Sequence, residues 1–256
     1  MTEPTVLVAY VHPATEIQHS FTVSLMNLVN YDAAHDQRLF GEVGGPLMMR
    51  AGTSGVPQAR IEIFRHWLDR TGDEWLWMVD TDMGFAPDTV DRLLEAADPV
   101  ERPVVGALCF GLRQAEPDGY GGYVTYPFPT MYGWGEDDNG NVGFQAAVQY
   151  PRDELVRVSG TGAACLLVHR SAAEKMRAEY GDDWFAPVRY PDGRFVSEDL
   201  SFCYRLGALD IPLHVHTGVR TTHAKIVWIG EQDFLAHRTL SQAVAATEPA
   251  AEAAEG

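Results

Sequence analysis

Two aspartates separated by one residue are the feature of this sequence best suited to chemistry. Asp80 and Asp82 directly follow the apolar run Trp75–Val79. Such a run predicts a central strand covered on both faces, and ligand sites of open α/β sheets lie at the carboxyl ends of strands. Two carboxylates there suit Mg²⁺ or Mn²⁺, which can also hold substrate phosphates. Paired aspartates are common in proteins. The alternative is therefore that Asp80 caps a turn and Asp82 is only solvated.

Glu198 and Asp199 form a second acidic pair, at the start of a predicted helix that extends to Leu206. Ser197 is a candidate N-cap, and acidic residues in a first turn interact favourably with the exposed amides of a helix. Taken alone, this pair is therefore explained by helix formation.

His223 is a third candidate, because it follows two predicted extended segments at 213–216 and 219–222. A neutral imidazole is a competent ligand for Mn²⁺, whereas a single histidine is more often structural. His214 and His216 alternate along one strand face and form another candidate metal pair, for which exposed strand positions are the simpler explanation.

The elements that must position these residues alternate between strands and helices. This alternation predicts an open, mostly parallel α/β sheet with helices on both faces and a β-hairpin insertion. Strands are predicted at 6–11, 38–43, 75–79, 104–109 and 156–168, helices at 17–29, around 61–68, from Pro87, at 171–180 and at 198–206, a loop at 44–55, and the insertion at 119–150 with a turn at 137–141. We expect one domain over residues 1–240 and a disordered Ala/Glu-rich tail over 241–256.

The composition excludes several classes of function. Lys and Arg number 19 against 36 Asp and Glu, so the formal net charge of −17 disfavours non-specific binding to nucleic acid. Cys109, Cys165 and Cys203 are too far apart in sequence for a zinc cluster or a disulfide framework. No apolar stretch is long enough to span a bilayer, and the amino terminus lacks the pattern of a signal peptide. These features indicate a cytoplasmic protein.

The order of these features resembles the GT-A fold glycosyltransferases that use nucleotide sugars, especially small bacterial and phage-encoded relatives of family 2. The resemblance covers roughly residues 5–233. Asp80-Thr81-Asp82 looks like the DxD motif of these enzymes, and Ser197-Glu198-Asp199 looks like their xED motif. Gly160-Thr161-Gly162 is similar to the segment that lines the acceptor side, and His223 matches the late metal histidine.

The resemblance implies a hexosyltransferase that moves a sugar from a UDP- or GDP-sugar to an acceptor hydroxyl, with inversion at the anomeric carbon. Mn²⁺ or Mg²⁺ would be held by Asp80, Asp82 and His223. Asp199, beside Glu198, would be the general base. The residues expected to contact the donor are Val11, His12, Arg60, Asp80, Thr81, Asp82, Gly160, Thr161, Gly162 and Lys225.

Two departures from the family pattern limit what the resemblance implies. The first strand ends in His12-Pro13, unlike the usual opening of family 2, so the nucleotide base stays undefined. The QxxRW motif of processive synthases is absent from the sequence, which favours addition of one sugar or a few. The acceptor is open among a glycan, a small molecule, a protein and a modified DNA base.

A phosphohydrolase of the haloacid-dehalogenase type is the main rival, with Asp80 as nucleophile, Lys175 as its lysine and Asp182-Asp183 as its late acidic pair. Against it, Met83-Gly84 follows the aspartate pair, and the pair lies on a late strand instead of the first. A non-catalytic module that binds sugar nucleotides is the other alternative.

Overall fold

The computed structural model describes residues 5–13, 16–35, 37–40, 46–117, 123–138, 140–190, 193–227, 229–231 and 233–235. The chain divides into two compact units. The first comprises Met1–Gly111 and Pro127–Ala224, and the second comprises Leu112–Tyr126 and Lys225–Gly256. The predicted tail at 241–256 lies outside the described residues.

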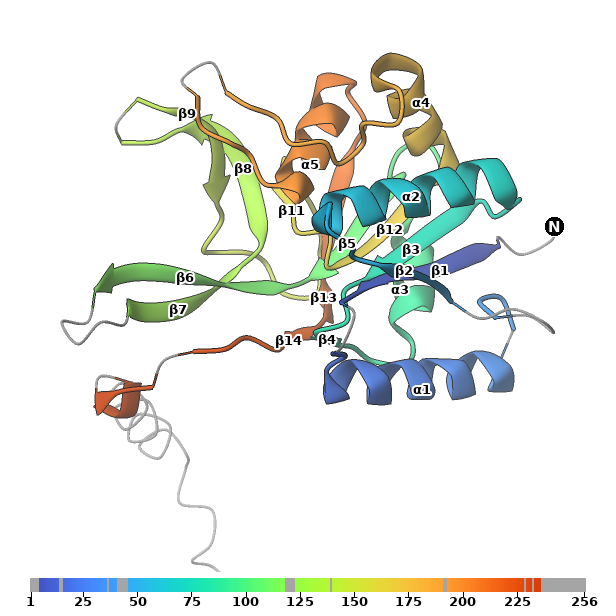
Figure 1. Ribbon diagram of the computed structural model, residues 1–256, viewed down its shortest axis with the longest axis horizontal. Helices are drawn as coiled ribbons and strands as arrows, with labels where there is room; N and C mark the ends of the chain where they lie inside the picture. The colour runs from blue at the N-terminus through green and yellow to red at the C-terminus, as the bar shows by residue number, and fades with distance from the viewer. Residues whose placement is uncertain are drawn as a thin grey trace, which may run out of the picture. The chain divides into compact units, whose positions relative to one another are not determined.

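The first unit is built on a mixed sheet of seven strands (Figure 1). Five strands run in one direction, whereas β12 is inserted antiparallel between β3 and β5, and β10 pairs antiparallel with β13 at one edge. In spatial order the strands are β10 (Leu155–Arg157), β13 (Leu213–Arg220), β5 (Val104–Leu108), β12 (Cys165–His169), β3 (Trp75–Val79), β1 (Val6–His12) and β2 (Leu47–Arg50).

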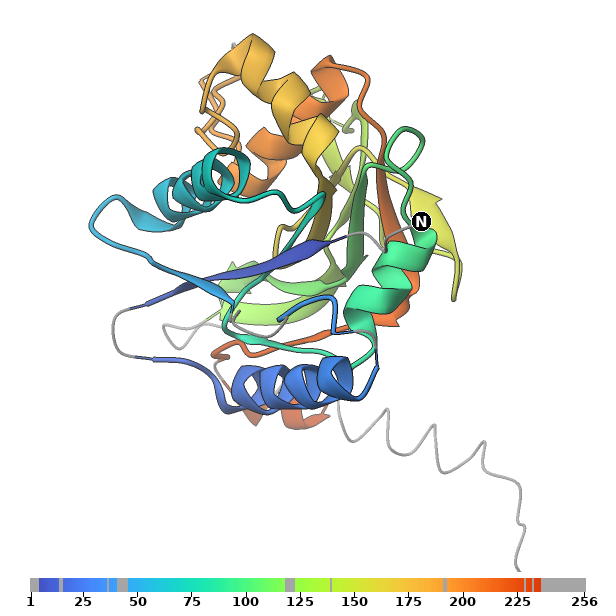
Figure 2. The ribbon, with the colours of Figure 1, turned by 90° about the vertical axis from the view of Figure 1, so that its right-hand side faces the viewer.

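Helices cover both faces of this sheet (Figure 2). The helices α1 (His19–Ala34) and α3 (Thr89–Ala96) lie on one face, and α2 (Gly55–Arg70), α4 (Arg170–Tyr180) and α5 (Glu198–Ala208) lie on the other. The central strand β3 is buried throughout, and alternate residues enter the two cores: Trp75, Trp77 and Val79 face α1 and α3, while Leu76 and Met78 face the other three helices. This two-sided burial explains its continuous apolar sequence.

The other described strands form three smaller sheets. The first comprises β11 (Gly160–Thr161), β8 (Met131–Glu136) and β9 (Val142–Ala146). The second pairs β4 (Met83–Gly84) with β14 (Thr222–His223), and the third pairs β6 (Phe110–Pro117) with β7 (Tyr123–Pro129). Among the described residues, no helix has the length and apolar character needed to cross a membrane.

The predicted elements are confirmed in the central sheet and differ in two places. The predicted strand at 38–43 is wrong, because 37–40 form turns, 41–45 lie outside the described residues, and the edge strand β2 follows at Leu47–Arg50. The predicted strand at 156–168 is three short strands in two sheets. The turn at 137–141 does join two antiparallel strands, β8 and β9.

Candidate active site

The aspartate pair is fixed by the backbone at the carboxyl end of β3. The Asp80 amide donates to the carbonyl of Ala164 at 2.9 Å, and the Met83 amide donates to the carbonyl of Asp80 at 3.2 Å. Thr81 is buried between the two aspartates, and its hydroxyl lies 3.4 Å from the Val11 carbonyl at the end of β1. The tight turn therefore sends both carboxylates out of the same edge of the sheet.

Arg60 of α2 joins this edge to the start of α5. Its side chain is only 3% exposed, and its Nη2 donates to both carboxylate oxygens of Asp80 at 2.9 and 3.1 Å. Its Nη1 donates to Glu198 at 3.2 Å and to Oδ1 of Asp199. One guanidinium thus collects carboxylates that are 20, 138 and 139 residues away in sequence. The planar fork of arginine suits this multiple contact better than the point charge of lysine does.

The start of α5 is held by its own N-cap and by packing below it. The Ser197 hydroxyl accepts from the Leu200 amide at 3.5 Å, as the sequence predicts. One turn later, the Cys203 thiol lies 3.4 Å from the Thr161 carbonyl and accepts from the Thr161 amide at 3.5 Å, which anchors α5 on β11. The two acidic residues of the first turn are therefore rigidly presented to Arg60.

The electrostatics of this cluster are dominated by Arg60 and by burial. Burial acts to lower the pKa of Arg60, but the charges of Asp199, Asp80 and Glu198 outweigh it and raise this pKa above its ordinary value. Burial raises the pKa of Asp80, which Arg60 opposes. Burial also raises the pKa of Glu198, and the neighbouring Asp199 charge adds to the shift. Arg60 consequently stays charged and stabilises the ionised carboxylates around it.

Asp82 and His223 form a second contact beside this cluster. Strand β14 pairs with β4, opposite Met83, and places Nε2 of His223 3.0 Å from Oδ2 of Asp82. Nδ1 of His223 lies 2.7 Å from the Phe110 carbonyl, which can only accept, so Nδ1 carries the proton. A neutral His223 would then direct its Nε2 lone pair at the carboxylate. Only a proton or a metal cation between the two atoms makes that contact favourable.

This donor set fits a divalent cation held jointly with a ligand. Among the described residues, no three His, Cys, Asp or Glu side chains form a closed metal cluster. Mg²⁺ and Mn²⁺ are commonly bound by one or two protein carboxylates while substrate phosphates complete the shell. Asp82 and His223 match that pattern, whereas the Asp80 carboxylate is taken by Arg60. The three-ligand set that includes Asp80 remains a prediction.

The glycines at 160 and 162 bring the β11 segment close to α5. A Cβ atom on Gly160 would lie 2.8 Å from the Phe144 ring and 2.9 Å from Leu200, so only glycine fits there. A Cβ atom on Gly162 would lie 3.7 Å from Oδ2 of Asp199. Thr161 between them is buried and donates its hydroxyl proton to the Thr130 carbonyl at 2.9 Å. The missing side chain at Gly162 therefore leaves a methyl-sized space between Thr130 and the Asp199 carboxylate.

Other predicted site residues are less central. His12 ends β1, and its Nδ1 lies 2.8 Å from the Pro13 carbonyl. Val11 is buried and contributes its carbonyl to Thr81. Lys225 belongs to the second unit, and its contact with the donor stays a prediction.

The residues required by the phosphohydrolase alternative do not converge on Asp80. Lys175 donates to the Leu209 carbonyl at 2.7 Å, and Asp182 accepts from Arg65 and Arg177 at 2.6 and 2.7 Å. Both oxygens of Asp80 accept from Arg60, so neither is a free nucleophile.

Sequence reasoning found the acidic residues but missed how they are held. It gave Arg60 only as a donor-binding residue, and the apolar neighbours of Arg60 on α2 give no sign of three carboxylate partners. It also missed the Phe110 carbonyl that orients His223, because a backbone acceptor leaves no mark in the sequence. The glycine at position 84 is a sequence signal that could have been used. A Cβ atom there would lie 2.5 Å from the Thr222 hydroxyl, so a larger residue would disturb the β4–β14 pairing that places His223.

No protein-family profile and no curated protein sequence matches the chain. Among solved structures, GalNAc-T7 with UDP, GalNAc and Mn²⁺ gives a TM-score of 0.54 at 11% identity, over 88% of this chain and 45% of that one. A197 from STIV gives 0.45 at 13% identity, over 87% and 86% of the two chains. A glycosyltransferase involved in glycosylation of the major capsid of PBCV-1 gives 0.41 at 14% identity, over 86% and 93%.

The sheet and its helices, together with the likeness to GalNAc-T7, define a GT-A type of α/β fold, as the sequence predicts. The chain spans less than half the length of the GalNAc-T7 chain that it matches. Within this fold, the carboxylates that contact Arg60 lie at the carboxyl end of β3 and at the start of α5, where this helix packs on the sheet.

Proposed function

We propose that this protein is a glycosyltransferase that moves a sugar from a nucleoside-diphosphate sugar to an acceptor hydroxyl, with Asp199 as the general base. One observation carries the proposal. Arg60 ties the carboxylate at the end of β3 to the two carboxylates at the start of α5, and it does so next to the Asp82–His223 contact. This arrangement supports the proposal, because the group that would hold the donor and the residue that would act as the base lie within one small region.

The charge of this region supports a donor that arrives with a cation. The four carboxylates of Asp80, Asp82, Glu198 and Asp199 outnumber the one guanidinium of Arg60. An anionic diphosphate would be repelled there unless a divalent ion were bound as well. Asp82 and His223 would hold Mn²⁺ or Mg²⁺, and the ion would neutralise negative charge on the departing diphosphate.

Asp199 is suited to act as a base because its two oxygens have different surroundings. Oδ1 accepts from Arg60, whereas Oδ2 forms no hydrogen bond with a described residue and lies beside the space left by Gly162. An acceptor hydroxyl in that space would transfer its proton to Oδ2 as its oxygen bonds to the anomeric carbon. The bond from that carbon to the diphosphate oxygen breaks, and its electron pair leaves with the nucleoside diphosphate. Attack on the opposite side of the leaving group inverts the anomeric centre.

The donor nucleotide is tested first with UDP and Mn²⁺, because the GalNAc-T7 structure of similar fold contains both. Thermal unfolding is measured with UDP or GDP, each with and without Mn²⁺. We expect stabilisation only when the nucleotide and the metal are present together, and we expect excess EDTA to abolish it. Release of inorganic phosphate from a phosphomonoester, without nucleotide binding, would favour the phosphohydrolase instead.

Two variants separate donor binding from transfer. Asp82→Ala should lose metal-dependent UDP binding. Asp199→Asn should bind UDP as the wild type does and lose sugar transfer by about 10² to 10⁴-fold, the range typical of a removed general base. Glu62→Gln, on the same helix as Arg60 but paired with Arg65, is the matched control and should retain both properties. Wild-type transfer by Asp199→Asn would show that the base is another group, and intact binding without any transfer by the wild type would favour a binding module.

A further inference from the structure

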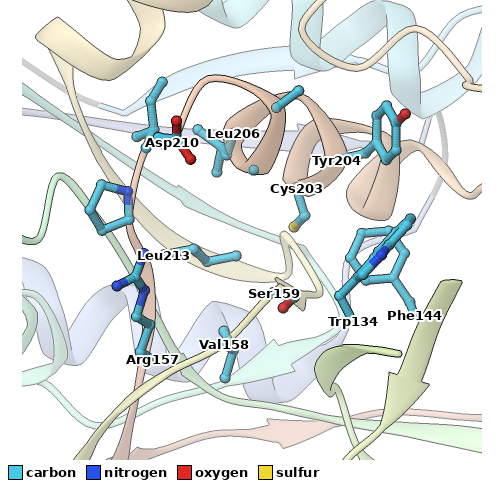
Figure 3. A pocket seen from close by; sticks show the side chains of 14 residues that line it. Trp134, Phe144, Arg157, Val158, Ser159, Cys203, Tyr204, Leu206, Asp210 and Leu213 are labelled. Carbon is cyan, nitrogen blue, oxygen red and sulfur yellow. The ribbon is translucent and has the colours of Figure 1, made fainter. Parts of the chain in front are cut away.

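A pocket of about 380 Å³ lies beside α5, between this helix, the β8–β9 hairpin and the starts of β11 and β13 (Figure 3). The proposed catalytic residues are not part of its wall. Ligand pockets for small molecules are commonly of this size and combine an apolar wall with a few polar groups. The six lining residues that carry the argument are Trp134, Phe144, Arg157, Ser159, Tyr204 and Asp210.

One side of the pocket is an aromatic wall. Trp134 and Tyr204 have their ring centroids 5.8 Å apart, and Phe144 supports Trp134 edge-on at 5.1 Å. Trp134 is 46% exposed and Tyr204 is 39% exposed, although both rings lie in contact with other aromatic side chains. Large aromatic rings that stay exposed side by side in a hollow offer flat apolar surface to a ligand.

The opposite side of the pocket carries two charged residues among aliphatic ones. Figure 3 shows Asp210 and Arg157 across the hollow from the three aromatic rings, with Ser159 at its base. In the part of the chain that the structure describes, neither the Asp210 carboxylate nor the Arg157 guanidinium has an ion-pair partner. Asp210 also holds a left-handed backbone (φ 54°) just after α5, a position where helices commonly have glycine.

We propose that this pocket binds a neutral sugar ring of the acceptor, and this inference rests on the glycosyltransferase function proposed above. The C–H groups on one face of a sugar ring suit the electron-rich face of an aromatic ring, while its hydroxyls suit a carboxylate and a guanidinium. A nucleotide could also stack on Trp134, but Asp210 offsets the charge of Arg157 in a protein of net charge −17, so the phosphates would find no net attraction there. The charge balance therefore favours an uncharged saccharide.

The position of the pocket assigns the ring to a part of the acceptor away from the reacting hydroxyl. Ser159 lines the pocket, and Gly162, three residues further along the chain and just after β11, lies beside Asp199. Three residues span at most about 10 Å, so the pocket lies within that distance of Gly162 along the chain. Phe144 and Leu200 pack against Gly160 between the two places. An oligosaccharide acceptor would thus contact the pocket with one ring and present another to Asp199.

The test is fluorine NMR of the full chain labelled with 5-fluorotryptophan, which gives one signal for each of the six tryptophans. The Trp134 signal is assigned with Trp134→Phe. The probes are cellobiose, maltotriose, chitobiose and mannobiose, with UDP and Mn²⁺ added to separate samples. We expect at least one saccharide to shift the Trp134 signal, and we expect Trp134→Ala and Asp210→Gly each to weaken that saccharide's binding, measured by calorimetry, about tenfold.

Asp210→Gly removes the carboxylate and at the same time relieves the left-handed backbone, so loss of folding does not confound it. Phe195→Ala removes an exposed aromatic ring outside the pocket and is the control, with unchanged saccharide binding expected. If no probe shifts the Trp134 signal while UDP with Mn²⁺ binds, the pocket proposal is overturned and the proposed function stands. If a saccharide binds at Trp134 but UDP does not bind, the proposed function fails and the saccharide site stands.

Discussion

At the scale of single residues, Arg60 determines the geometry of the candidate site. Its guanidinium is almost fully buried and contacts Asp80, Glu198 and Asp199, which are a quarter or more exposed on their outer sides. The ring of Phe185, 5.7 Å from the Arg60 guanidinium carbon, covers it from the core. Arg60 holds Asp199 through Oδ1, so in the proposed function it would be a positioning residue that leaves Oδ2 for the acceptor.

Arg60→Lys should keep the positive charge but lose the fork that reaches three carboxylates. We expect a loss of about 2 kcal/mol in the free energy of unfolding, because at least one buried hydrogen bond to a carboxylate is lost without replacement. Sugar transfer should fall mainly in kcat, since the base is misplaced while nucleotide binding at Asp82 is retained. Urea unfolding and steady-state kinetics measure the two effects.

Arg65→Lys is the matched control, because Arg65 lies on the same helix and pairs with Glu62 and Asp182 at the surface. Exposed ion pairs of this kind contribute less than about 1 kcal/mol, so activity and stability should change little. An Arg60→Lys enzyme with wild-type kcat would show that Asp199 needs no help from Arg60.

Gly160 is the second residue whose identity the structure requires. In Gly160→Ala, the new methyl group would overlap Phe144 and Leu200, and we expect a loss of about 1–3 kcal/mol in unfolding free energy. Gly133→Ala on β8 is the control, since nothing lies within 4 Å of a Cβ there. Thermal or urea unfolding of both variants measures the difference. Equal stability of the two would mean that Phe144 can move aside freely.

At the scale of elements, the sequence predicted those strands and helices that have a continuous apolar run, a helical periodicity or a clear cap. The run Trp75–Val79 is a buried strand because both of its faces are covered, and the helix after Ser197 begins at its predicted cap. The edge strand β2 was misplaced because its residues Leu47–Arg50 are half exposed and lie next to a glycine-rich loop. A short strand with one paired edge leaves a weak sequence pattern, so its position depends on the pairing with β1.

Helix α4 has an N-cap that titrates. Nδ1 of His169 accepts from the Ser171 amide at 3.2 Å, and burial lowers the pKa of His169 below its ordinary value. In the unfolded chain a histidine binds its proton with a pKa of about 6.5, so the unfolded state takes up more protons as the pH falls. Stability is therefore fully present above pH about 6.5 and is lost below it, up to the roughly 1 kcal/mol of a helix cap.

His169→Asn keeps a capping oxygen and removes the titration. We expect unfolding free energies measured by urea between pH 7 and pH 5 to fall less steeply in this variant than in the wild type. Burial also lowers the pKa values of the half-buried strand histidines His214 and His216, but both are present in the two proteins, so their contributions cancel in the difference. Parallel pH profiles of the two proteins would assign the acid sensitivity to those strand histidines instead.

At the scale of the whole molecule, the strand order could not be predicted from the sequence. The alternation of elements predicted an open α/β sheet, but nothing local specifies that β12 enters antiparallel between β3 and β5. That insertion brings Ala164 beside Asp80, and it brings the glycines at 160 and 162 beside α5. The candidate site joins segments up to 141 residues apart, so the convergence of its predicted members depends on long-range pairing.

Cys109, Cys165 and Cys203 report on the cooperativity of the first unit, because they lie directly after β5, on β12 and on α5, respectively. All three are buried, and burial raises the pKa of Cys109 and of Cys203 to about 12. Since the thiolate is the reactive form, we expect no labelling by a disulfide reagent at pH 8 in the native protein. In low urea the three thiols should react at one common rate set by global unfolding. Faster labelling of Cys203 alone, measured by mass spectrometry of peptides, would show that α5 opens independently of the sheet, and would locate the least stable contact of the candidate site at its junction with Thr161.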